Sequence, residues 1–174
     1  GSIISNAPTP GQSLLILLDA LQPIGMSTVI LDQNNLLPAL GATASINSIL
    51  PIQALETGAF SNLATVVAPI SSARYGSTIL KASLRRPDGS ISSVDLKQGG
   101  FEVLPLKLGE VGDLSLVPRG RTDIGQGPGK KLVTKVGGSA LGVVIDGRGR
   151  PLELTSDNVR RRDLIKKWLW SLGG

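Results

Sequence analysis

The stretch Thr78–Leu96, TILKASLRRPDGSISSVDL, decides the fold of this chain. Residues 78–84 alternate apolar side chains with smaller or charged ones, which indicates a β-strand. Pro87, Asp88 and Gly89 predict a turn, because proline fixes φ and glycine accepts a positive φ. Residues 91–96 return as a second strand, so the sequence predicts a β-hairpin.

Further strand patterns lie on both sides of this hairpin. Each is a short run rich in aliphatic or β-branched residues and bounded by turn-forming residues. Short strands at this spacing are typical of a β-barrel or a β-sandwich. The expected strands cover residues 65–70, 101–106, 113–117, 131–136, 140–145 and 151–154.

The segment before these strands is predicted to be mainly helical. Thr9 and Pro10 are typical of a helix start, and Pro23 and Gly25 stop that helix. Residues 28–31 are apolar on both sides, which indicates a buried strand. The expected helices run from Thr9 to Pro23, over 36–46, and from Ser48 or Pro51 to before Gly58.

The last segment has the clearest helical pattern. Ser156 or Asp157 is the expected N-cap, and Gly173 and Gly174 end the helix. Its apolar residues recur at helical spacing and are Val159, Leu164, Ile165, Trp168, Leu169 and Leu172.

These patterns predict an α+β fold. A short helical N-terminal part packs on a mainly antiparallel β-barrel or sandwich, and a C-terminal amphipathic helix follows. Gly1 and Ser2 are typical of the remnant that protease cleavage leaves after tag removal. The expected division is 1–2 for the cloning remnant, 3–60 for the helical and apolar segment, 61–155 for the β-rich domain and 156–174 for the final helix.

Composition removes several classes of chemistry. The 174 residues contain no cysteine and no histidine, and only 3% of them are aromatic. Thiolate nucleophiles, Ser-His-Asp groups and the commonest transition-metal ligands are therefore absent. We expect a non-catalytic chain with no catalytic residue, no cofactor and no metal.

Charge is distributed unevenly. Up to Ala73 the chain holds three acidic residues and no basic one, so the net charge of +5 belongs to the second half. No apolar run reaches the length of about 18 residues that a membrane span needs, and no basic region of the signal-peptide kind precedes the first apolar run. We therefore expect a cytoplasmic protein without membrane association.

A glycine-rich loop with lysines is the first candidate binding site. Gly127, Gly129, Lys130 and Lys131 resemble a phosphate cradle, because glycines expose backbone N–H groups beside positive charge. The spacing is not that of a P-loop, and no Ser or Thr follows the lysines to hold magnesium. A structural loop between two strands is the favoured alternative.

Arginines near the C-terminus are the other candidates. Arg148 and Arg150 follow Asp146 in a basic turn that contacts an acidic partner or, in the favoured alternative, is a hairpin whose Asp146–Gly147 pair supplies the positive-φ corner. Arg160 and Arg161 belong to a basic face of the last helix, together with Arg162, Lys166 and Lys167. This face docks on nucleic acid or an anionic membrane or, in the favoured alternative, stays solvated. Trp168 and Trp170 must lie on different helix faces, so we expect Trp170 to be available for a partner.

Several segments, taken in order, resemble a known family. They are Leu31–Asp32, residues 36–42 (LLPALGA), residues 103–106 (VLPL), residues 123–129 (DIGQGPG), residues 137–152 (GGSALGVVIDGRGRPL) and the Arg-rich terminal helix with its tryptophans. In this order they resemble the C-terminal region of the glutamate mutase L family, which is unrelated to the mismatch-repair proteins of similar name.

The resemblance implies a place in the actin-like ATPase superfamily. Such a protein is expected to be an accessory factor of adenosylcobalamin-dependent mutases, with its nucleotide-binding loops in a preceding region. It would make residues 3–60 the end of an ATPase-like fold, and it assigns no functional residue here. The partners would be the rest of the parent ATPase or a mutase, with a homo-oligomer as a further possibility. The alternative from the residues themselves is an anion-binding or nucleic-acid-binding module, with nucleic acid disfavoured by the shortage of aromatic residues.

Overall fold

The computed structural model describes residues 7–47, 49–56 and 60–173. The cloning remnant expected at Gly1 and Ser2 lies outside the described residues, as does Gly174 at the expected end of the last helix. None of the described helices is long and apolar enough to cross a bilayer.

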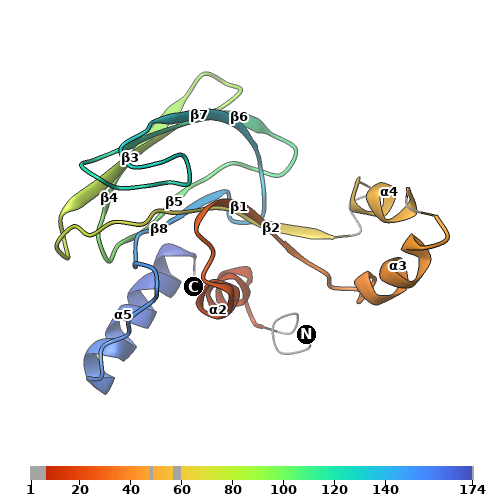
Figure 1. The fold of residues 1–174 in the computed structure, drawn as a ribbon, viewed down its shortest axis with the longest axis horizontal. Coiled ribbons are helices and arrows are strands. Elements are labelled where there is room, and N and C mark those ends of the chain that lie inside the picture. Colours follow the sequence, from red (N-terminus) through yellow and green to blue (C-terminus); the bar gives the residue numbers. More distant parts are fainter. Residues whose placement is uncertain (1–6, 48, 57–59, 174) are drawn as a thin grey trace.

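Two four-stranded sheets form the centre of an α+β fold. The first sheet contains, in spatial order, β1 (Gly25–Leu31), β2 (Ser61–Ala68), β8 (Val143–Asp146) and β5 (Phe101–Leu104). The second sheet contains, in spatial order, β4 (Ile91–Lys97), β3 (Thr78–Arg85), β6 (Val111–Pro118) and β7 (Leu132–Gly137). The sheets pack together without closing a barrel, so the sandwich alternative of the prediction is confirmed (Figure 1).

The hairpin predicted from residues 78–96 is confirmed as β3 and β4. The two strands pair antiparallel, from Thr78 opposite Lys97 to Arg85 opposite Ile91. Gly89 has φ +83°, and its N–H donates to the Arg86 carbonyl oxygen at 3.0 Å. Glycine therefore supplies the turn conformation that the Pro-Asp-Gly signal predicts.

The main apolar core lies between the two sheets. It takes side chains from β2, β5 and β8 on one side and from every strand of the second sheet on the other. Burial alternates along the strands of the second sheet. In β3, for example, Leu80, Ala82 and Leu84 are buried while Lys81 and Arg85 are exposed. The outer face of that sheet therefore contacts solvent, as is usual for antiparallel sheets.

A second core covers the opposite face of the first sheet. There Ala64, Val66 and Val144 pack against helices α2 (Pro10–Leu21) and α5 (Asn158–Ser171). Strands β2 and β8 are thus buried on both faces, and they form the parallel pair of an otherwise antiparallel arrangement. The result is three layers, namely helices, first sheet and second sheet (Figure 1).

The helix caps agree with the sequence. The Thr9 hydroxyl accepts from the Gln12 N–H, and Pro10 occupies the first turn of α2. The Asp157 carboxylate accepts from the N–H groups of Val159 and Arg160 and so caps α5. Each cap satisfies backbone donors that the first helical turn leaves unpaired.

Helices α3 (Leu37–Ala44) and α4 (Leu50–Glu56) form a hairpin between β1 and β2. They project beyond the ends of these two strands, away from the three layers (Figure 1). Asp32 accepts from the N–H groups of Leu36 and Leu37 and so begins α3. No residue of α3 is buried.

Three sequence expectations need correction. Strand β1 is not buried on both sides, because it is the edge of its sheet and only its first residue, Gly25, is buried. Residues 151–154 form no strand, because Arg150 and the Leu152 N–H bond to Pro23 and Gln22 in the turn after α2 and not to a neighbouring strand. The boundary expected between residues 60 and 61 falls within the first sheet, since β1 on one side of it pairs with β2 on the other.

Leu84→Ala tests the core between the sheets. Leu84 is fully buried on β3, so its truncation leaves a cavity and lowers the free energy of unfolding by about 2–5 kcal/mol. Urea unfolding followed by circular dichroism measures the loss. Leu108→Ala, at an exposed leucine, is the matched control and changes the free energy of unfolding by about 0.5 kcal/mol or less. Equal losses in the two variants would contradict this core.

Candidate functional site

The loop after β8 is built around a buried carboxylate. Asp146 is fully buried, and its two oxygens accept from Nε and Nη2 of Arg148 at 2.8 and 2.9 Å. Arg150 adds a third contact, from Nη2 to Asp146 Oδ2 at 2.7 Å. Each Asp146 oxygen therefore accepts charge-assisted hydrogen bonds, which is the condition under which a buried carboxylate stays ionised.

Arg148 connects this loop to the two helices of the second core. Its Nη1 donates to Asp19 Oδ1 of α2 at 2.7 Å. The guanidinium carbon lies 5.3 Å from the ring centroid of Phe101 on β5 and 4.8 Å from that of Trp168 on α5. Arg148 is therefore held between two aromatic rings, and it joins β5, the β8 loop, α2 and α5.

The charges of this network shift its pKa values. Burial by itself raises the pKa of Asp146, but the hydrogen bonds and positive charges of Arg148 and Arg150 outweigh it, so the pKa lies below its ordinary value. Burial likewise disfavours the charged form of Arg148, but Asp146 and Asp19 outweigh it and raise its pKa. The aspartate and the arginine are both charged throughout the neutral range.

The expected surface role of Arg148 and Arg150 does not agree with their positions. Their side chains are only 1% and 3% exposed, and their N–H groups donate to Asp146, Asp19 and the Pro23 and Gly149 carbonyl oxygens. Neither guanidinium group keeps a free pair of N–H donors with which to bind an external anion. These arginines hold the fold together instead.

The hairpin turn expected at Asp146–Gly147 is also corrected. The positive φ of this loop belongs to Gly149, at +99°, and not to Gly147. Gly147 is needed for a different reason, because a Cβ there would lie 2.9 Å from the Lys97 carbonyl oxygen. No strand follows to complete a hairpin.

The glycine-rich loop before β7 binds its own carboxylate. Asp123 Oδ1 accepts from the N–H groups of Gly125 and Gly127 at 2.7 and 2.9 Å. The Gly129 N–H donates to the Thr122 carbonyl oxygen. The backbone donors that resemble a phosphate cradle are thus already paired, while Lys130 and Lys131 are exposed beyond them.

The remaining predicted contacts lie together on α5. Arg160 is exposed, and Arg161 is partly exposed and donates to Asn158. Trp168 is buried while Trp170 is 80% exposed, so the expected division between the two tryptophans is confirmed. The structure therefore brings Arg160, Arg161 and Trp170 onto one helix and leaves the glycine loop as a separate region.

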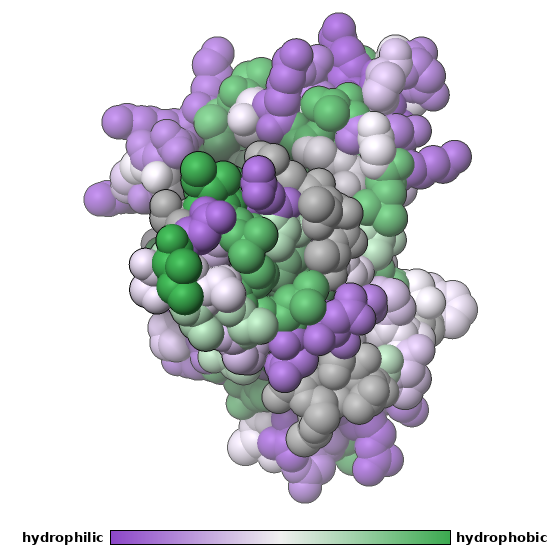
Figure 2. Space-filling model, turned by 90° about the vertical axis from the view of Figure 1, so that its right-hand side faces the viewer, coloured by the Kyte–Doolittle hydropathy of each residue, from purple (hydrophilic) through white to green (hydrophobic). Residues whose placement is uncertain are grey.

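A large apolar surface lies at the α3–α4 hairpin. We call it the hairpin face, and its exposed side chains are Leu37, Ile46, Ile49, Leu50 and Ile52. Residues 33–55 contain no charged residue at all. Figure 2 views the molecule from this side and shows hydrophobic residues gathered on it. Exposed apolar side chains gathered on one side of a folded chain make this face a candidate interaction site.

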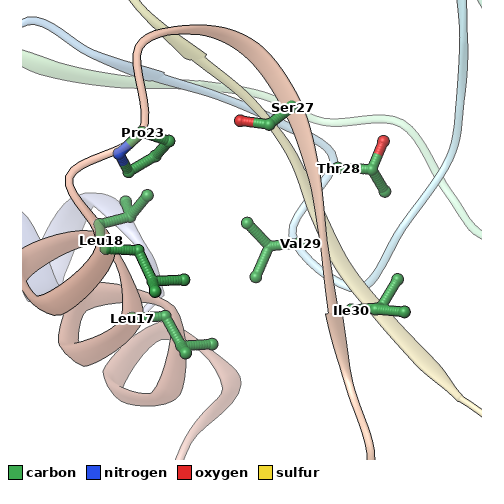
Figure 3. A pocket seen from close by; sticks show the side chains of 8 residues that line it. Leu17, Leu18, Pro23, Ser27, Thr28, Val29 and Ile30 are labelled. Atoms are coloured by element: carbon green, nitrogen blue, oxygen red, sulfur yellow. The ribbon is translucent and has the colours of Figure 1, made fainter. Parts of the chain in front are cut away.

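An apolar groove of about 240 Å³ continues this surface between α2 and β1. It is lined on one side by Leu17, Leu18 and Leu21 of α2 with Pro23, and on the other by residues 27–30 of β1 (Figure 3). A second hollow extends it from Leu17 and Ile30 towards Leu37. We call the first of these the β1 groove.

The sequence indicates only part of these apolar sites. The absence of basic residues before Ala73, and of any charged residue over 33–55, is visible in the sequence and points to a surface that needs a cover. The β1 groove is not visible there, because it depends on α2 lying beside an edge strand. Among the described residues, no group of three or more acidic side chains is placed to hold a metal ion.

Asp146→Asn tests the buried network. The substitution removes the charge that compensates Arg148 and Arg150, so the free energy of unfolding falls by about 3–5 kcal/mol at neutral pH. Denaturant unfolding measures it. Asp95→Asn, at an exposed position of β4, is the control and has little effect. A loss no larger than that of the control would show that the network contributes nothing.

The same carboxylate gives the stability a pH dependence. Because the pKa of Asp146 is lowered by folding, its stabilisation is complete above the unfolded pKa of about 4 and is lost as pH falls through the folded pKa. The difference in free energy of unfolding between wild type and Asp146→Asn should therefore be constant from about pH 7 to 5 and shrink below about pH 4. Urea unfolding at each pH measures this difference, and a gap that widens with acidification would contradict the assignment.

Comparison of the chain with protein-family models, with curated proteins and with solved structures gives no match. Membership of the glutamate mutase L family therefore stays a prediction from the motifs. The functional proposal below rests on the geometry of the described residues.

Proposed function

We propose that this chain is a cytoplasmic, non-catalytic interaction module that docks on a partner protein through the hairpin face. The observation that carries the proposal is an apolar, uncharged helical hairpin held away from the body of the fold. Ile46 is 87% exposed, and Ile49 and Ile52 are each more than half exposed. Covering such side chains is favourable at about 25 cal/mol per Å² of apolar surface.

The position of the hairpin supports docking rather than a role in the core. No residue of α3 is buried, and α3 and α4 contribute no residue to either apolar core among the described residues. Asp32 nevertheless fixes the start of α3 through two backbone hydrogen bonds of 2.9 and 2.8 Å. The hairpin is thus an ordered element whose described apolar side chains pack into neither core.

The family resemblance supplies the expected partner. If the chain is the C-terminal region of a glutamate mutase L protein, the hairpin face covers the actin-like ATPase body of the same protein or an adenosylcobalamin-dependent mutase. An uncharged surface suits both, because a permanent interface of this kind excludes charge from its centre. The module would then bind the partner, and the partner would catalyse the reaction.

A second candidate function rests on α5. Arg160, Arg162, Lys166 and Lys167 form no salt bridge among the described residues. Trp170 lies one helical turn beyond Lys166 and Lys167 and is exposed. An acidic surface or a nucleic-acid backbone would fit this helix. The glycine loop adds nothing to this candidate, because Asp123 already accepts from its N–H groups.

Ile46→Lys combined with Ile52→Lys tests docking through the hairpin face. Two desolvated charges at its centre should reduce capture of an ATPase or mutase from lysate of the source organism by at least about tenfold, because burying unpaired charge is costly. Affinity capture with mass-spectrometric identification measures this.

Val133→Lys is the matched control, because Val133 is equally apolar and 67% exposed but lies on β7 of the other sheet. It should capture the partner as wild type does. Capture of nucleic acid alone, released by high salt and unchanged in the double variant, would replace the proposal with the α5 candidate.

A further inference from the structure

One edge of the first sheet differs from every other sheet edge. Strands β4, β5 and β7 are also edges, and each carries a charged side chain, at Asp95 and Lys97, at Glu102 and at Lys135 respectively. Strand β1 contains none in its seven residues. Charge on an edge strand prevents another strand from pairing with it, so β1 lacks the protection that the other three edges have.

The free edge of β1 has unused hydrogen-bonding capacity. β1 pairs only with β2, and no other described residue forms a backbone hydrogen bond with residues 25–31. Successive backbone N–H and C=O groups of a strand point to alternate sides, so some of those in β1 point away from β2. The buried Ser27 hydroxyl, which lines the β1 groove, also has no hydrogen-bond partner.

The β1 groove runs along this free edge. Neighbouring residues of a strand point to opposite faces, so a hollow that contacts four consecutive residues, 27–30, follows the edge and not one face. In Figure 3 Val29 points towards Leu17 and Leu18 of α2, while Thr28 and Ile30 point away from that helix. An added strand would therefore place alternate side chains over the leucines of α2.

We propose that β1 pairs antiparallel with β1 of a second copy of this chain, about a two-fold axis at Thr28, so that the first sheets of two copies form one continuous sheet. Thr28 is the middle residue of β1. An axis there places Met26 of each copy opposite Ile30 of the other, and both side chains are exposed in the single chain. Cross-strand apolar and Thr–Thr pairs of this kind stabilise sheets.

Charge distribution limits where two copies of this chain can meet, and it leaves β1 as a contact without repulsion. The chain carries +5, and its basic residues all follow Ala73, so two copies repel each other through their second halves. β1 lies in the half without any basic residue and brings no charge to the axis. Exposed Leu21 and Ile24 before β1 would meet the Ile30 end of the other copy, because antiparallel pairing joins opposite ends.

Sedimentation equilibrium of the whole chain over a range of concentrations tests the pairing, which does not depend on docking through the hairpin face. Wild type should show twice the monomer mass, and Thr28→Lys should raise the dimer dissociation constant by about tenfold or more, because it places like charges opposite each other. Thr28 is exposed, so the variant keeps its fold, which circular dichroism checks. Val133→Lys on the β7 edge should leave the dimer unchanged.

Hydrogen exchange provides a second, independent measurement. Amide protons of residues 25–31 should become more protected as the concentration of wild type rises, and those of β7 should not. A monomer at every concentration would overturn the proposal. A dimer that Thr28→Lys does not weaken, or one without concentration-dependent protection of β1, would equally overturn it. The Ile46→Lys and Ile52→Lys variant should remain dimeric, so failure of docking and failure of pairing are distinguishable.

Discussion

The bidentate pair between Arg148 and Asp146 is the interaction on which the layered arrangement depends. Two helices from opposite ends of the chain cover the first sheet, and few backbone hydrogen bonds hold them there. Arg148 reaches α2 through Asp19 and α5 through the Trp168 ring, while Asp146 fixes it to the end of β8. Removing this one side chain would remove both the ion pair with α2 and the ring contact with α5.

A buried ion pair of this kind does not stabilise merely by its charge. Desolvation of both ions offsets most of their attraction, and an apolar replacement of equal shape is often as stable. What the network adds is a fixed orientation of the elements that it joins. Its hydrogen bonds have fixed geometry, and Arg150 extends them to the Pro23 carbonyl oxygen, at the turn between α2 and β1. The network therefore sets the position of α2 relative to β1, and with it the shape of the β1 groove.

Local signals in the sequence predict the elements, and non-local contacts decide the rest. The Pro-Asp-Gly turn and the Thr9 and Asp157 caps act over a few residues, so the hairpin and the helix starts follow from the sequence. Arg148 and Asp19 are 129 residues apart, and nothing in the basic turn shows that its arginines point inward. The position of β1 at an edge likewise depends on strand order. β2 lies between β1 and β8, and β1 pairs with no strand other than β2.

The same strand order explains why the apolar surfaces lie on one side of the molecule. The core between the sheets takes side chains from β2, β5 and β8 but none from β1, so the second sheet leaves β1 uncovered. The α3–α4 hairpin continues from the free end of that uncovered strand. Because all basic residues lie beyond Ala73, the chain separates a first part with only three charged residues, all of them acidic, from a second part that carries every basic one. The ion pair between Asp19 of the first part and Arg148 of the second joins the two parts, beside the pairing of β2 with β8.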